Sequence, residues 1–140
     1  MPITDRVKRL LWSRSGGYCQ NPNCRNVFFT FFERGEITSI EELAHIIAQR
    51  IDGPRGQNTL PLTQRDEYEN IILLCSNCHS LVDKNPQQFP EELLLDWKSQ
   101  HVKIIKEAFV VPVYADRNSL SVEIHKLLRR NRRIFHSYGT

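Results

Sequence analysis

The 140-residue sequence has no long hydrophobic run, no internal repeat and no low-complexity tract. Its longest aliphatic run, Ile71–Leu74, is far too short to cross a bilayer, which takes about 20 residues. The first residues carry charges throughout and lack the apolar segment of a secretory signal peptide. We therefore expect a cytoplasmic protein that does not bind membranes.

A strong overall charge is also lacking. The net charge is +3, but it is unevenly distributed. Residues 1–116 contain 13 Lys and Arg against 15 Asp and Glu, whereas residues 117–140 contain 6 against 1. Overall basicity is therefore weak evidence for nucleic-acid binding. Any DNA-binding surface in the first part of the chain must be a local patch.

Cysteine is sparse, with four residues in the chain, and these occur in two pairs. Cys19 and Cys24 enclose four residues, while Cys75 and Cys78 enclose two. Because disulfides are rare in the cytoplasm, two pairs with this spacing predict a structural zinc site with four thiolates. The alternative is two chance pairs of free, buried cysteines. A zinc ion held in this way contributes about 10 kcal/mol or more to the folding of a small module.

Hydrophobic periodicity predicts an α+β domain over residues 1–109, flanked at its two ends by helices. The first helix is expected over about residues 4–14, capped by Thr4 and stopped by a Gly-Gly pair. The last is expected over about residues 91–109, where apolar residues recur at helical spacing.

Between these helices we expect three strands, a loop and a short helix. A buried strand is expected over residues 27–32, covering the first cysteine pair. A second is expected over 37–47, although SIEELAHIIAQ also fits a helix. A long irregular loop over 52–68 precedes a buried strand at 71–74. Ser76 is then expected to cap a short helix that ends at Asn85.

Residues 110–140 form a basic helical tail in this interpretation, either a small regulatory region or the start of a second one. An extended segment over 110–114 is followed by an amphipathic helix over about 120–136. The arginines of this helix can bind DNA or a partner, or they can solvate one face of the helix.

Polar residues follow a definite order around the second cysteine pair. His45 ends a predicted strand, Asn70 opens the next, His79 follows Cys78 on the short helix, and Asp83 shares a helix face with His79. This order, in ELAHII, NIILLCSNCH and LVD, resembles the HNH endonucleases, which have the ββα-metal fold. The resemblance covers about residues 18–84, and the two cysteine pairs bracket the fold as they do in zinc-containing members.

The resemblance implies a metal-dependent hydrolysis of DNA phosphodiester bonds that leaves 5′-phosphate and 3′-hydroxyl ends. His45 corresponds to the general base, and Asn70 to the residue whose amide braces the backbone that carries this base. His79 corresponds to the helix residue that binds a catalytic Mg2+ or Mn2+ ion. Ala44 stands where many members of the family carry a metal ligand. An AHI-type subset of the family has alanine at this position, as this chain does. Asp83 or Glu42 can replace that ligand.

Other polar residues carry less specific expectations. Arg50, Arg55 and Arg65 flank the long loop and can clamp DNA phosphates, or they can simply be solvated. We interpret His101 and His125 as structural helix residues without partners.

The sequence contains nothing that resembles a sequence-reading module. We therefore expect a nuclease domain that is directed to double-stranded DNA by something else. A bacterial defence or restriction-type effector, controlled by a sensor or ATPase partner, would fit this organisation, and a homodimer is possible. The alternative is a zinc-stapled nucleic-acid-binding module that has lost catalysis.

Overall fold

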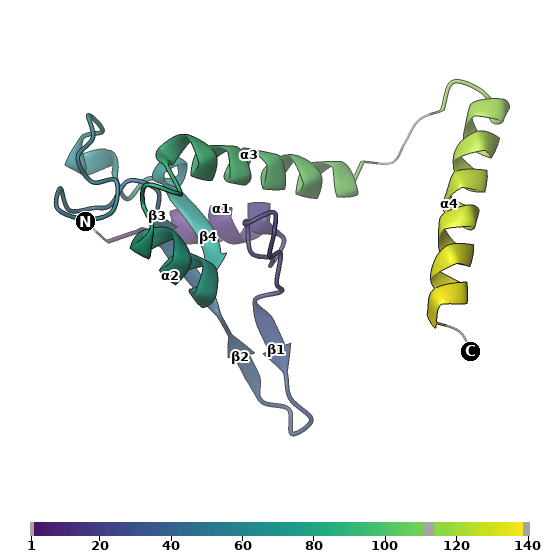
Figure 1. The fold of residues 1–140 in the computed structure, drawn as a ribbon, viewed down its shortest axis with the longest axis horizontal. Coiled ribbons are helices and arrows are strands. Elements are labelled where there is room, and N and C mark those ends of the chain that lie inside the picture. Colours follow the sequence, from purple (N-terminus) through teal and green to yellow (C-terminus); the bar gives the residue numbers. More distant parts are fainter. Residues whose placement is uncertain (1, 111–113, 139–140) are drawn as a thin grey trace. The chain divides into compact units, whose positions relative to one another are not determined.

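The computed structural model describes residues 2–110 and 114–138 and divides the chain into two compact units, Met1–Phe109 and Val110–Thr140. The first unit is a small α+β domain with two antiparallel two-stranded sheets. Its elements (Figure 1) are α1 Asp5–Ser15, β1 Phe29–Phe31, β2 Ile37–Ser39, β3 Glu41–His45, β4 Ile71–Cys75, α2 Ser76–Lys84 and α3 Glu91–Ala108. Among the described residues, no helix is long and apolar enough to cross a membrane.

The centre of this domain is a unit of two strands and a helix. β3 pairs antiparallel with β4, and the register places Glu41 opposite Cys75 and His45 opposite Ile71. All five residues of β4 are buried, as expected for a strand of aliphatic residues at the core. β4 continues directly into α2, so the last strand residue and the first helical turn lie beside one another.

Two flanking helices pack on this unit, as predicted from the sequence. Thr4 caps α1 by accepting a hydrogen bond from the backbone N–H of Val7 at 3.3 Å. Gly16 ends α1 in the left-handed conformation, with φ of 63°. His101 of α3 is buried, and its Nε2–H donates to the carbonyl of Ser15 at 2.7 Å. His101 is therefore structural, but the expectation that it has no partner was wrong.

The prediction of a buried strand over residues 27–32 was wrong. Phe28 is fully buried, with its ring edge-on to Trp12 at 5.5 Å. Beyond it, β1 and β2 form a hairpin that projects from the domain (Figure 1), and Phe31 is 75% exposed. Trp12 stacks on Phe29 at one end of this ribbon, with ring centroids 5.3 Å apart, but all three residues of β1 remain exposed.

The predicted strand over residues 37–47 is divided in two. β2 belongs to the projecting hairpin and β3 to the central unit, with Ile40 between them. The backbone of Ile40 links the hairpin to the central unit. Its N–H donates to the carbonyl of Phe28, and its carbonyl accepts from the N–H of Ser76. The helical alternative for this segment is excluded.

The long loop contains more structure than expected. Two short 3-10 turns, Leu62–Gln64 and Tyr68–Asn70, interrupt it. Arg65 between them is buried and donates to the carbonyls of Leu60 and Ala48 at 3.1 and 2.7 Å. These hydrogen bonds from the Arg65 side chain stabilise a loop that has few apolar residues. Because Arg65 is 2% exposed, the expectation that it is solvated or contacts DNA phosphates was wrong.

The capping role expected of Ser76 was also wrong. Cys75 is the N-cap residue of α2, and no side-chain hydrogen bond caps the helix. Ser76 is already helical, and its backbone N–H donates to the carbonyl of Ile40 at 3.0 Å.

The second unit contains the helix α4, Arg117–Tyr138, which is longer at both ends than the predicted 120–136. Asp116 caps it, because its Oδ1 accepts from the backbone N–H of Ser119 at 2.8 Å. The extended segment predicted over 110–114 lies partly outside the described residues.

Candidate metal centre and polar cluster

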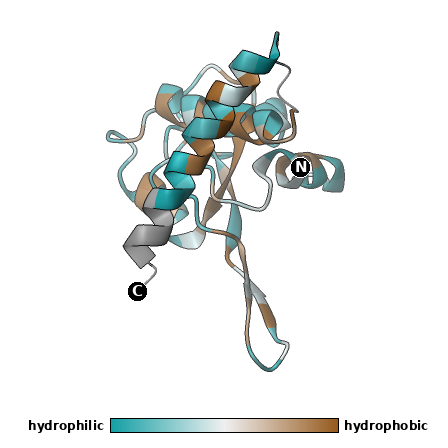
Figure 2. Ribbon diagram, turned by 90° about the vertical axis from the view of Figure 1, so that its right-hand side faces the viewer, coloured by the Kyte–Doolittle hydropathy of each residue, from teal (hydrophilic) through white to brown (hydrophobic). Residues whose placement is uncertain are grey.

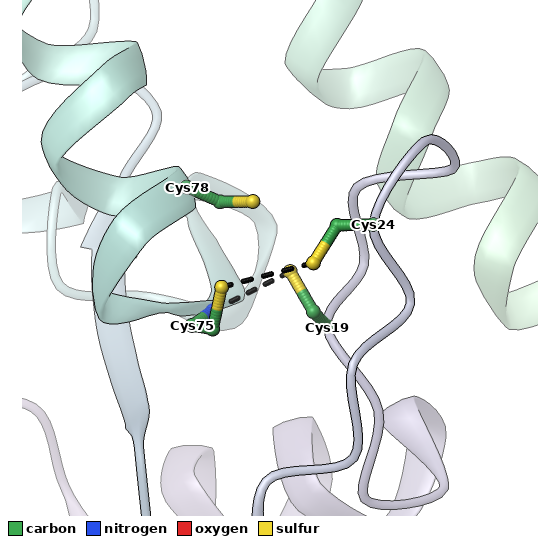
Figure 3. Close-up of side chains that lie close together, drawn as sticks. All are labelled: Cys19, Cys24, Cys75 and Cys78. Atoms are coloured by element: carbon green, nitrogen blue, oxygen red, sulfur yellow. Dashed lines mark hydrogen bonds between the residues drawn. The ribbon is translucent and has the colours of Figure 1, made fainter.

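Four thiols from two distant segments converge in the domain. The Sγ atoms of Cys19, Cys24, Cys75 and Cys78 all lie within 4.8 Å of one another (Figure 3). The first two come from the loop between α1 and β1, and the other two from the end of β4 and the first turn of α2. Within residues 2–110 and 114–138, this is the one group of three or more potential metal ligands that converges in this way.

The geometry of this group fits a zinc ion. Tetrahedral zinc with Zn–S bonds of about 2.3 Å separates its sulfur ligands by about 3.8 Å. The Sγ atoms of Cys24 and Cys75 are 3.8 Å apart. The four cysteines can therefore hold zinc, as the sequence predicted.

Hydrogen bonds to sulfur support the same interpretation. The backbone N–H of Cys75 donates to Cys19 Sγ at 3.4 Å, and Asn21 Nδ2 donates to Cys78 Sγ at 3.3 Å. Burial raises the pKa of the Cys19 thiol above its usual range and that of Cys78 to about 11. Burial acts in the same direction on Cys75, but hydrogen bonds, first of all from Cys78, lower its pKa. Because burial favours the protonated form of Cys19 and Cys78 in the absence of metal, zinc binding at these two thiols must release protons.

The segment that carries Cys19 is tied to the central strand. The backbone N–H of Gln20 donates to the carbonyl of Leu73 at 3.0 Å, and the N–H of Leu73 donates to Gln20 Oε1 at 2.8 Å. Gln20 is buried, and it thus pairs with β4 on the edge that β3 does not occupy. The first cysteine pair is fixed to the strand that ends in the second.

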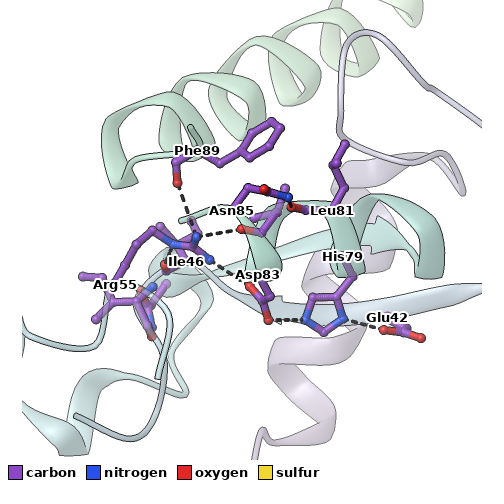
Figure 4. A network of polar contacts seen from close by, with 11 residues as sticks. Glu42, Ile46, Arg55, His79, Leu81, Asp83, Asn85 and Phe89 are labelled. Carbon is purple, nitrogen blue, oxygen red and sulfur yellow. Dashed lines mark hydrogen bonds and ion pairs between the residues drawn. The ribbon is translucent and has the colours of Figure 1, made fainter. Parts of the chain in front are cut away.

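A polar cluster lies on the other side of α2, around His79. The side chain of His79 contacts a carboxylate at each ring nitrogen (Figure 4): Nδ1 contacts Glu42 Oε2 of β3, and Nε2 lies 3.0 Å from Asp83 Oδ2. The hydrogen bond to Asp83, helped by Glu42, raises the pKa of His79 against the opposing effect of burial.

Glu42 and Asp83 approach opposite ends of the imidazole ring, so they do not stand beside the same ring nitrogen. In this arrangement a cation on Nε2 would have Asp83 as its neighbouring carboxylate, whereas a cation on Nδ1 would have Glu42. The sequence suggested either residue as the ligand that replaces Ala44. Ala44 itself is buried in the apolar core.

Arg55 positions one of these carboxylates. Its Nη2 donates to Asp83 Oδ1 at 2.9 Å, and the side chain is only 7% exposed. Three further hydrogen bonds from this guanidinium go to backbone carbonyls, of Ile46 at 2.5 Å, Val82 at 3.2 Å and Phe89 at 3.3 Å (Figure 4). Burial works to raise the pKa of Asp83, but the charges and hydrogen bonds of His79 and Arg55 lower it.

The two loop arginines therefore differ in their surroundings. The guanidinium of Arg55 is turned into the domain and is occupied by four acceptors, so its geometry gives no support to the predicted phosphate contact. Arg50 is 81% exposed and pairs with Asp52 at 3.0 Å. The prediction that Arg50 contacts phosphate stays a prediction.

His45 belongs to a second group of polar residues, at the end of β3. Its Nε2 lies 2.8 Å from Asp66 Oδ1, and the other oxygen of Asp66 accepts from Gln49 Nε2 at 2.9 Å. A carboxylate can only accept, so Nε2 of His45 carries the proton in this contact. Nδ1 of neutral His45 is then the unprotonated nitrogen.

Asn70 braces the chain that follows His45. Its Oδ1 accepts from the N–H of Ile47 at 2.9 Å, and its Nδ2 donates to the carbonyls of Ile47 and Arg65, both at 2.8 Å. The backbone carbonyl of Asn70 also accepts from Ile46 at 2.8 Å. The side chain of Asn70 is thus buried and fully paired.

Sequence reasoning missed two residues of these clusters. Asp66 lies in the polar part of the long loop, and nothing in the sequence distinguishes its carboxylate from its neighbours. The role of Arg55 depends on residues about 30 positions later in the chain, in α2 and before α3. The chain matches no protein-family model and no curated protein.

Proposed function

We propose that residues 1–109 form a metal-dependent endonuclease of the HNH type that hydrolyses DNA phosphodiester bonds. The observation that carries the proposal is the unit of β3, β4 and α2. It orders His45, Asn70 and His79 as the family does, and the cysteine cluster fixes the start of its helix. A histidine with two carboxylates and a histidine with one carboxylate are the groups that such a reaction requires.

The cluster around His79 is the proposed site of the catalytic Mg2+ or Mn2+. Nε2 of His79 and Asp83 would hold the ion, while Glu42 accepts the proton on Nδ1 and fixes the ring. We favour Asp83 as the ligand because Arg55 already orients its carboxylate. When bound, such an ion stabilises charge on the phosphate and on the departing oxygen.

His45 is the proposed general base. Asp66 accepts the proton on Nε2 and so leaves Nδ1 to take a proton from the attacking water. Asn70 holds the backbone just after His45, which keeps the imidazole in one place. Asp66 is thus a positioning residue in this proposal.

The proposed substrate is double-stranded DNA, directed to the site by something outside this domain. Residues 1–109 contain 13 of the basic residues but no excess of them. A domain with little positive charge needs help to reach DNA. A sensor or ATPase partner of a defence system would provide that help.

The test is a plasmid-nicking assay with Mg2+ or Mn2+ on the zinc-loaded protein. We expect His45→Ala and His79→Ala to lose activity by about 100-fold or more. His125→Ala, an exposed histidine of α4, is the matched control and should keep full activity. Equal residual cleavage in all three variants would mean that a contaminating nuclease, and not this site, cuts the DNA.

The two carboxylates can be separated with a pair of isosteric variants. Asp83→Asn removes the proposed ligand and should abolish Mn2+ binding together with cleavage. Glu42→Gln keeps an acceptor at Nδ1 and should lower cleavage only about 10- to 100-fold. The reverse order of effects would assign the ion to Nδ1 and Glu42.

A binding module without catalysis is the second candidate, favoured by Ala44. This residue is 1% exposed and packs in the core where many HNH enzymes carry a metal ligand. Under this alternative the protein binds DNA with equal affinity in the presence and absence of Mg2+, and no variant of His45 changes that affinity. Measurable cleavage that depends on His45 excludes it.

A further inference from the structure

The helix α4 carries an apolar face that has no partner within its own unit. Leu120, Ile124 and Leu127 are 40%, 44% and 51% exposed. Among the described residues of Val110–Thr140, there is no second helix or strand against which this face could pack. Helices in proteins draw most of their stability from the packing of an apolar face. A helix of 22 residues with this pattern therefore needs a partner.

The spacing of the face identifies the kind of partner. Leu120, Ile124, Leu127 and Asn131 follow one another at intervals of four, three and four residues, which is the heptad spacing of a coiled coil. Ile134 continues the series in the sequence. The apolar residues recur along α4 in Figure 2.

The residue types at these positions are specific. Ile124 and Asn131 occupy the heptad position called a, while Leu120 and Leu127 occupy position d. A β-branched residue at a with leucine at d favours two parallel strands, and a single asparagine at a fixes register and the number of strands. A polar residue at position a costs stability but specifies how the strands pair, which gives Asn131 a role on this face of the helix.

Between Leu120 and Leu127 the charges of α4 leave this seam free. Arg117 occupies position a in the first turn of the helix and Arg130 occupies the flanking position g. The other basic residues described, Lys126, Arg129 and Arg132, lie on the side away from positions a and d. Val122 also lies on that outer side, where it is 56% exposed.

We propose that α4 pairs with α4 of a second copy of the chain as a parallel two-stranded coiled coil. Leu120, Ile124 and Leu127 form the apolar layers, and the two Asn131 side chains meet in one polar layer. The chain is then a dimer whether or not its first unit is a nuclease, and the dimer brings two such units together.

Sedimentation equilibrium of the full zinc-loaded chain tests this proposal. We expect a dimer, and Leu127→Asp should raise its dissociation constant by about 100-fold or more because a carboxylate enters the seam. Val122→Asp makes the same change on the outer side and should leave the dissociation constant within about threefold. Zinc content and the near-ultraviolet circular dichroism of both variants show that the first unit remains folded.

Asn131 tests strand number and orientation. Asn131→Val should stabilise the assembly and admit species larger than a dimer. Asn131→Cys should give a disulfide-linked dimer under mild oxidation that leaves the parent chain uncrosslinked. In an antiparallel pair position 131 would face position 120, and the two cysteines would lie about 16 Å apart, beyond disulfide reach.

Several results would overturn the proposal. A parent chain that stays monomeric at all concentrations has no such seam, and a parent trimer or tetramer contradicts two strands. A dimer that survives Leu127→Asp, or that Val122→Asp disrupts equally, is held by a different surface. Failure of Asn131→Cys to crosslink in a dimer that Leu127→Asp dissociates would exclude the parallel arrangement.

Discussion

Replacing Arg55 by methionine should destabilise the first unit by about 3–4 kcal/mol. The guanidinium donates to three backbone carbonyls and to Asp83, and the side chain is 7% exposed. A buried acceptor that loses its donor costs about 1–3 kcal/mol, and we take about 1 kcal/mol for each carbonyl because the backbone around it can relax. Asp83 is 35% exposed, so water will replace part of its pairing, and we assign it at most about 1 kcal/mol. Methionine retains most of the packing of the arginine stem, which keeps a cavity from adding to the loss.

Urea unfolding of the zinc-loaded protein, followed by the fluorescence of Trp12 and Trp97, measures this change. Arg50→Met is the matched control, because the Arg50 side chain is 81% exposed and should change the free energy of unfolding by no more than about 0.5 kcal/mol. A double-mutant cycle of Arg55→Met with Asp83→Asn then separates the carboxylate from the carbonyls. We expect a coupling energy well below the total.

The reasoning is refuted if Arg55→Met loses less than about 1 kcal/mol, since the three carbonyls would then find water or other donors at no cost. A coupling energy between Arg55 and Asp83 as large as the whole loss of stability in Arg55→Met would also refute the reasoning. It would mean that Arg55 acts through Asp83 alone and does not tie the loop to α2 and to the segment before α3.

Three further predictions concern the zinc site, a buried lysine and a buried glycine. Cys75→Ser, or a strong chelator, should unfold the first unit, detected as loss of near-ultraviolet circular dichroism, whereas His79→Ala should leave that signal intact. Burial lowers the pKa of Lys98 from 10.5 to about 8, so the unfolded chain binds one more proton between these pH values. The free energy of unfolding of the parent should therefore rise by up to about 3 kcal/mol from pH 8 to 10.5 relative to Lys98→Met, and parallel curves would contradict this. A Cβ at Gly56 would lie 2.2 Å from the carbonyl oxygen of Arg50, so Gly56→Ala should cost about 1–3 kcal/mol or more in thermal unfolding, while Gln57→Ala beside it changes little.

The sequence predicted those features that depend on local chemistry. α1 follows from Thr4 as a cap and Gly16 as a stop, and α3 follows from its apolar spacing. The convergence of the four cysteines follows from the spacing of each pair, because the same spacing recurs wherever two segments share one zinc ion.

The features that the sequence did not predict depend on which distant residues contact a segment in the folded chain. The aromatic residues of β1 indicated a buried strand, but Phe29 and Phe31 are 41% and 75% exposed in the projecting hairpin, although Trp12 stacks on Phe29. Arg55 was a candidate phosphate ligand because it lies in the long loop, and only the folded chain brings the carbonyls of Val82 and Phe89 to it. Asp66 could not be paired with His45, because the two are 21 positions apart in a loop without regular spacing.

The hydrogen bonds between Gln20 and β4 connect the cysteine cluster to the risk of aggregation. β4 is a run of buried aliphatic residues, Ile71–Cys75, of the kind that adds readily to strands of other molecules. β3 occupies one edge of this strand, and Gln20 occupies the opposite edge at Leu73. If the cysteine cluster holds zinc, loss of that ion would release the segment that carries Gln20 and leave an apolar edge strand open to other chains. The supply of zinc during synthesis should therefore decide whether this chain stays dispersed or is lost to insoluble aggregates.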